Sequence, residues 1–139
     1  RSGRYTPSEW ANVALRCYTR WSADAYVVER NFGGDLVREN MINHGMDGRI
    51  IETVSARGKE LRAEPIVGLY EQGKIHHTIN ADTNTDLSDL EEQMCGWVPS
   101  DRTAKSPDRV DALVFALTEV MKDRKRTTIA SPASLGRVG

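Results

Sequence analysis

The chain has 139 residues, and its 19 Lys and Arg against 20 Asp and Glu leave a net charge of -1, so no overall positive field attracts nucleic acid or an anionic membrane. Its hydrophobic content of 39% and mean hydropathy of -0.52 suit one globular domain, and no apolar run approaches the roughly 20 residues of a membrane span. Cys17 and Cys95 lie far apart without metal-ligand spacing, so we expect free thiols in a reducing cytoplasm.

The predicted elements alternate between helices and strands. Thr6-Pro7-Ser8-Glu9 is typical of a helix start, and helical spacing of apolar residues continues to about Arg20. Short β-rich runs predict three strands, at 25–29, 49–54 and 74–77. Helical patterns predict four further helices, at 35–43, 62–72, 87–95 and 107–121. This order predicts an α/β domain over residues 1–122 with at least three parallel strands and helices on both faces of the sheet.

The last part of the chain differs in composition from the rest. From residue 122 it turns basic, and then it becomes small and polar. Such a segment cannot bury enough apolar surface to fold by itself. We therefore expect residues 123–139 to form a basic, disordered tail.

Candidate site residues follow from the expected sheet, because ligands of open α/β sheets collect beyond the carboxyl ends of the strands. Glu29 ends the first predicted strand, and Asp108 and Asp111 lie one turn apart at the start of the last helix. If that helix start meets the sheet edge, these carboxylates form a set that suits Mg²⁺ or Mn²⁺, and two such ions can hydrolyse a phosphodiester. Ordinary explanations exist as well, since a strand-end Glu is commonly solvated and the helix dipole favours Asp in a first turn.

Basic and histidine side chains form two further groups. Arg57, Lys59 and Arg62 cluster before and within a predicted helix start, where cations are not the preferred charge, and this favours contact with backbone phosphate. His76 and His77 are adjacent on a predicted strand and would point to opposite faces, which indicates a structural or surface role for both.

Four blocks of sequence carry a family resemblance: residues 28–35 (VERNFGGD), 54–65 (VSARGKELRAEP), 69–73 (LYEQG) and 106–113 (SPDRVDAL). Together, over roughly residues 6 to 121, they resemble the C-terminal nuclease domain of tailed-phage and prophage terminase large subunits. The resemblance implies an α/β, ribonuclease-H-like three-layer fold and a two-metal endonuclease that cuts concatemeric double-stranded viral DNA. It implies three partners besides DNA, namely the packaging ATPase domain of the same polypeptide, the portal and the small terminase subunit, in the bacterial host cytoplasm.

The resemblance also implies roles for single residues. Glu29 looks like the second acidic metal ligand, and Asp108 and Asp111 are the candidates for the third, with Asp108 favoured as the direct ligand. Arg57 and Lys59 look like the family's basic pair near phosphate. In the family, a first catalytic Asp lies on an antiparallel meander upstream of the helix that begins here at Pro7. We therefore expect a nuclease domain that lacks its N-terminal β-meander.

Other functions stay open at this point. The same domain could be a non-catalytic module that docks to DNA or to the portal, which the neutral overall charge favours. A small-molecule α/β enzyme fits the topology, but the chain has no complete cofactor motif. A sheet edge left open by missing strands would also allow a homodimer.

Overall fold

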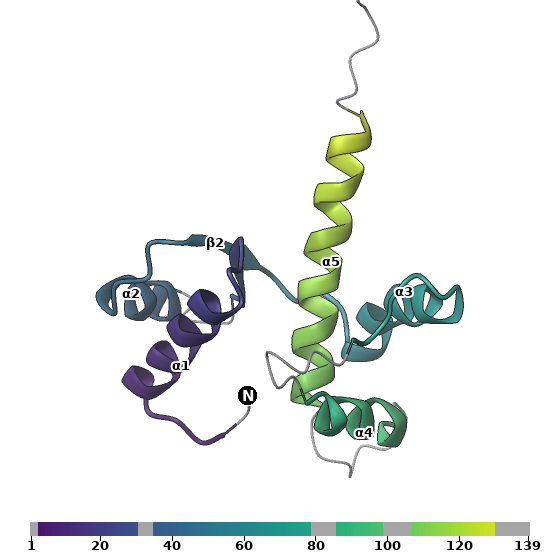
Figure 1. The fold of residues 1–139 in the computed structure, drawn as a ribbon, viewed down its shortest axis with the longest axis horizontal. Helices are drawn as coiled ribbons and strands as arrows, with labels where there is room; N and C mark the ends of the chain where they lie inside the picture. The colour runs from purple at the N-terminus through teal and green to yellow at the C-terminus, as the bar shows by residue number, and fades with distance from the viewer. Residues whose placement is uncertain (1–2, 31–34, 79–85, 99–106, 130–139) are drawn as a thin grey trace, which may run out of the picture.

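The fold is an alternation of helices and strands followed by three helices (Figure 1). The computed structural model describes residues 3–30, 35–78, 86–98 and 107–129, the last seven of them by backbone alone. Its elements are α1 (Pro7–Arg20), β1 (Ala25–Glu29), α2 (Asp35–Asn43), β2 (Arg49–Thr53), α3 (Lys59–Glu71), α4 (Ser88–Gly96) and α5 (Asp108–Ile129). Within these residues Cys17 and Cys95 are free thiols, as expected, and no helix is long and apolar enough to cross a bilayer.

Helix α1 begins where the sequence predicts it, because Thr6 and Glu9 form a capping box. The Glu9 carboxylate accepts a 2.8 Å hydrogen bond from the Thr6 amide, and the Thr6 hydroxyl accepts one of 3.4 Å from the Glu9 amide. Just after α2, Gly45 adopts a φ of +77°, a left-handed conformation that glycine takes readily. These two local signals fix the start of α1 and the turn that follows α2.

The sheet consists of two parallel strands among the described residues. β1 pairs with β2 in the register Ala25 to Arg49 through Glu29 to Thr53, and α2 makes the crossover. The expected third strand at 74–77 is not formed, so that prediction was wrong. The Lys74 amide instead bonds to the Leu69 carbonyl and closes the end of α3, while Ile75 packs against the core beside that helix.

Helices cover both faces of this sheet, as the sequence predicts. Successive side chains of a strand alternate between these two faces. Tyr26 and Val28 of β1 pack against a buried cluster on the α1 and α2 side, formed by Ala11, Met41 and Met46. The alternate residues of β1 face α5, since Ala25, Val27 and Glu29 line one cleft with residues of that helix. The pleat therefore turns the Glu29 carboxylate toward α5.

A second core lies on the far side of α5. Its buried residues come from α3 and α5 and are Ala63, Ile66, Val110 and Val114, with side chains of α4 packed against them. Figure 1 shows the two groups of elements separated by α5, with α1, α2 and the sheet on one side and α3 and α4 on the other. The hydrophobic core is thus divided into two clusters, one among α1, α2 and the sheet and the other among α3, α4 and α5.

Two helix boundaries differ from those predicted by more than one residue. α3 begins at Lys59 rather than Arg62, so two of the three basic candidates lie in its first turn. α5 continues to Ile129, so residues 123–129, expected in the tail, are helical. Residues 130–139 lie outside the described residues, and the domain boundary near residue 122 stays a prediction.

Candidate active site

The three candidate acids line a single cleft of about 460 Å³ between β1 and α5. Glu29 comes from the carboxyl end of β1, and Asp108 and Asp111 come from the first turn of α5. Lys59, from the first turn of α3, lines the same cleft. The start of the last helix therefore does meet the strand end. The roles of the three acids as catalytic or metal-binding residues stay predictions.

The Arg62 guanidinium lies between two of these acids. Its Nη2 is 2.6 Å from Asp111 Oδ1, and its Nη1 is 4.0 Å from Glu29 Oε1. Nη1 also donates to the carbonyl of Arg57 at 3.0 Å, and the guanidinium carbon lies 4.8 Å from the centre of the Phe115 ring. Only 14% of the Arg62 side chain is exposed. Arg62 thus joins β1, α3 and α5 at one point.

Lys59 adds a second cation to the same acids. Its Nζ lies 3.1 Å from Asp111 Oδ2 and 3.9 Å from Asp108 Oδ1. Asp111 therefore has one carboxylate oxygen beside each cation. The two aspartates differ in depth, since the Asp111 side chain is 13% exposed and the Asp108 side chain 72% exposed. Asp111 is an inner residue of the cleft, and Asp108 lies at its mouth.

The local reason for this arrangement is a match between two helix starts. Lys59 and Arg62 are three residues apart on α3 and share one face, and Asp108 and Asp111 do the same on α5. The acids suit the positive end of α5, and they supply the negative charge that makes cations acceptable in the first turn of α3. The sequence contains this signal as one basic and one acidic pair with i, i+3 spacing. From the sequence alone the basic pair indicates only phosphate contacts.

A side chain from α4 fixes the start of α5. Gln93 Oε1 accepts hydrogen bonds from the amides of Arg109 and Val110, at 2.8 and 3.1 Å. These amides are among the unpaired donors of a helix start, so Gln93 satisfies part of the end of α5. Gln93 therefore helps to position Asp108 and Asp111, a role that sequence reasoning missed.

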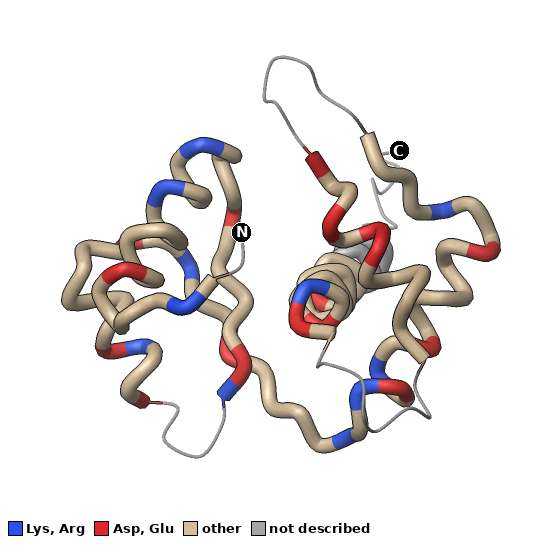
Figure 2. The backbone as a smooth tube through the Cα atoms, turned by 90° about the horizontal axis from the view of Figure 1, so that it is seen from below, with Lys and Arg blue, Asp and Glu red and all other residues tan. Residues whose placement is uncertain are grey.

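The predicted basic cluster is divided by the structure. Lys59 lines the acidic cleft, and Arg62 is paired with two of its acids. Arg62 also lines, together with the exposed Arg57, a neighbouring apolar groove of about 640 Å³ between α3 and α5. Figure 2 shows Lys and Arg interspersed with Asp and Glu along the described chain. The three basic residues do not act as one open patch in this conformation.

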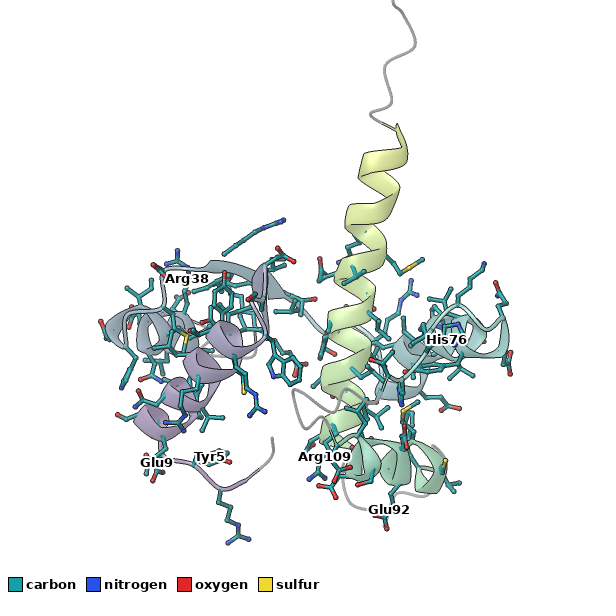
Figure 3. All side chains as sticks on the ribbon, in the orientation of Figure 1. Tyr5, Glu9, Arg38, His76, Glu92 and Arg109 are labelled. Atoms are coloured by element: carbon teal, nitrogen blue, oxygen red, sulfur yellow. The ribbon has the colours of Figure 1, made fainter. Side chains whose placement is uncertain are left out.

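The two adjacent histidines lie outside the cleft. His77 Nε2 is 2.8 Å from the Tyr70 hydroxyl and its Nδ1 is 2.7 Å from Glu91 Oε1, so His77 joins α3 to α4. Burial of the hydroxyl and the nearby charge of Glu91 raise the pKa of Tyr70. His76 is exposed, and Figure 3 shows it beside α3. These contacts agree with the structural and surface roles that the sequence favoured.

The cleft as arranged does not fit a metal ion. Carboxylate oxygens are suitable donors for Mg²⁺, but both oxygens of Asp111 lie beside cationic nitrogens, and Arg62 lies between Asp111 and Glu29. In the part of the chain that the structure describes, no three Asp, Glu, His or Cys side chains are grouped so that they could hold a metal ion.

Comparison with known proteins identifies the family. No curated protein and no solved structure gives a significant match to the chain. The profile of a family described as the terminase RNaseH-like domain matches residues 2–119, which is most of the chain and includes every candidate residue of the cleft. The match confirms the resemblance found in the sequence, and the chain belongs to the terminase RNaseH-like domain family.

Proposed function

We propose that this domain is the endonuclease of a viral DNA-packaging terminase and that it cuts concatemeric double-stranded DNA by hydrolysing phosphodiesters with Mg²⁺ or Mn²⁺. The observation that supports this most strongly is the meeting of Glu29 and Asp111 at one guanidinium, inside a cleft of a chain that belongs to the terminase family. This supports the proposal because two acids that are distant in sequence line the same cleft.

In this proposal Glu29 and Asp111 are the acids that hold divalent metal, and Asp108 is a helper at the mouth. The sequence favoured Asp108 as the direct ligand, and the geometry supports the reverse order because Asp111 is the more buried acid. If divalent ions are held by these acids, the chemistry that they would supply is two-metal hydrolysis of a phosphodiester.

The basic residues would contact the DNA backbone. Arg57 is exposed beside the cleft, and Lys59, at its wall, is partly exposed. Phosphate contacts of this kind position a duplex without reading its sequence. The proposed partner of these residues is therefore double-stranded viral DNA. The family resemblance adds the packaging ATPase domain of the same polypeptide, the portal and the small terminase subunit as proposed partners, inside the bacterial host.

A plasmid-nicking assay in Mn²⁺ tests the proposal. We expect the chain to nick supercoiled plasmid and both Glu29→Gln and Asp111→Asn to lose this activity. The matched control is Glu92→Gln, an exposed acid on α4 away from the cleft (Figure 3), which should cut like the unaltered chain. Retained cutting in either cleft variant would contradict the assignment of the acids.

The second candidate is a non-catalytic module that docks to DNA or to the portal. The observation that favours it is that the cleft acids are paired with Lys59 and Arg62 rather than grouped for metal. Salt-dependent DNA binding without cleavage in any metal would support this function instead.

The proposed homodimer through an open sheet edge is a separate proposal. Light scattering of the purified chain tests it directly.

A further inference from the structure

The disagreement between the cleft and a metal ion is itself informative. Each acid that we assign to metal lies beside an internal cation, since Arg62 lies beside both Glu29 and Asp111, and Lys59 lies beside Asp111. Carboxylates gathered in one cleft repel each other unless a positive charge lies between them. In the described structure α3 supplies that charge.

The contacts of Arg62 show that the acids are its main partners. The 2.6 Å contact with Asp111 is a short, charge-assisted hydrogen bond, which is among the stronger polar contacts in proteins. By contrast, Arg62 Nε is buried and has no hydrogen-bond partner among the described residues. A buried donor without a partner is costly, so this position of the guanidinium is only partly satisfied. The guanidinium is held by Asp111, the Arg57 carbonyl, Glu29 and the Phe115 ring, and a move out of this position would end the burial of the unpaired Nε.

We propose that Arg62, assisted by Lys59, is the counter-ion of the metal-free cleft and that a divalent ion binds Glu29 and Asp111 only by displacing the Arg62 guanidinium. This inference rests on the proposed function, because it takes Glu29 and Asp111 as the metal-binding acids. In this inference the cations of α3 inhibit metal binding by the cleft acids.

Displacement also gives the freed cations a new task. Arg62 and Lys59 lie in the first turn of α3, so both cations are close to any anion that enters beside the cleft acids. A DNA phosphate entering the cleft supplies one. Because coupling between two ligands is reciprocal, metal then strengthens DNA binding and DNA strengthens metal binding by the same factor.

Direct measurement of Mn²⁺ binding tests the displacement without any cleavage assay. Free Mn²⁺ is counted by electron paramagnetic resonance in titrations of the full chain and its Arg62→Gln, Lys59→Gln and Asp111→Asn variants, at about 0.15 M salt so that distant charges are screened. The matched control is Arg109→Gln, because Arg109 forms a 2.7 Å ion pair with Asp89 at the α4 end of α5 and lies outside the cleft (Figure 3).

The expected result is a rise in Mn²⁺ affinity of roughly tenfold in Arg62→Gln, the factor that corresponds to losing one charge-assisted hydrogen bond. Lys59→Gln should bind Mn²⁺ more tightly by a smaller factor, and Arg109→Gln should bind like the unaltered chain. If circular dichroism shows that Arg62→Gln is unfolded, the rise in Lys59→Gln decides the question.

The other outcomes separate the inference from the proposed function. Unchanged or weaker Mn²⁺ binding in folded Arg62→Gln, or in Lys59→Gln where that variant decides, overturns the displacement. If binding is at the same time lost in Asp111→Asn, the metal assignment survives. Unchanged binding in Asp111→Asn overturns both, because Mn²⁺ then binds elsewhere.

Discussion

Asp111 and Arg62 form an ion pair of 2.6 Å between α5 and α3, and each side chain is almost fully enclosed. The two residues are 49 positions apart, so this contact links segments that the sequence does not bring together. It joins the acidic start of one helix to the basic start of another. A ligand that binds the Asp111 carboxylate therefore meets this pair.

The first prediction concerns the stability that this pair supplies. Asp111→Ala leaves the enclosed Arg62 guanidinium beside Glu29 alone, so we expect the free energy of unfolding to fall by about 2–3 kcal/mol, somewhat less than for a fully buried pair. Asp108→Ala removes an exposed carboxylate and should cost less than about 0.5 kcal/mol. Urea unfolding followed by circular dichroism measures both values. Equal losses would show that depth in the cleft is not what separates the two aspartates.

The second prediction concerns cleavage. If Asp111 is the direct ligand, Asp111→Asn should lower the nicking rate in Mn²⁺ by roughly 10²-fold or more, as for the removal of one strong electrostatic group from an active site. Asp108→Asn should lower it by less than about tenfold, because its partner Lys59 also faces Asp111. Initial rates on supercoiled plasmid provide the comparison. The opposite order would restore Asp108 as the ligand that the sequence favoured.

The third prediction concerns DNA binding. Arg57 is exposed, so Arg57→Ala should weaken binding to any duplex and lower the slope of log affinity against log salt by about 1. Arg109→Ala, which removes a cation outside the cleft, should leave the slope unchanged. Fluorescence anisotropy with one labelled duplex over a range of salt concentrations measures these slopes. A slope that is the same in Arg57→Ala would exclude a phosphate contact for this residue.

The fourth prediction follows from the divided core. Ile66→Ala in the α3 and α5 cluster and Met41→Ala in the α1 and α2 cluster should each cost about 2–5 kcal/mol. Because the clusters share few neighbours, hydrogen exchange should accelerate mainly in the half that carries the substitution. Exchange measured by mass spectrometry distinguishes the halves. Uniform acceleration across all helices would mean that the two clusters unfold as one unit.

The fifth prediction uses the capping box of α1. Hydrogen bonds from the backbone and then the side chain of Thr6 hold the pKa of Glu9 below its usual value. A carboxyl whose folded pKa is lowered stabilises the fold above its ordinary pKa, and this stabilisation is lost as the pH falls through the lower folded value. The melting temperature of Glu9→Gln should therefore lie below that of the unaltered chain at pH 7, and the difference should shrink toward pH 3. A difference that stays constant with pH would contradict the charged cap.

Much of the fold follows from local signals in the sequence. The residues 25–29 and 35–43 are a strand and a helix with the predicted bounds, because strand-forming residues in one and helical spacing in the other dominate these segments. The third strand was wrong for a tertiary reason. Ile75 packs against the second cluster and His77 bonds to Tyr70 and Glu91, so this segment has side-chain partners in place of a neighbouring strand.

The site was predictable in its members but not in its pairing. Strand-end and helix-start rules place Glu29, Asp108 and Asp111 near one edge, and the structure brings them into one cleft. The depth of each acid depends on how α3 packs against α5, and a sequence pattern does not contain that crossing. For the same reason the cations Lys59 and Arg62 were expected at DNA phosphate and are found beside carboxylates.

The division of the core has a mechanical consequence for the cleft. Glu29 belongs to the half of the domain that packs through the α1 and α2 cluster, whereas Arg62 and Asp111 belong to the half that packs through the α3 and α5 cluster. A small hinge rotation of one half against the other changes the gap across which Glu29 and Arg62 face each other at 4.0 Å, without disturbing the packing inside either half. The width of the cleft therefore depends on how the two halves sit against each other, and a substrate or a neighbouring domain that binds either half can change it from a distance.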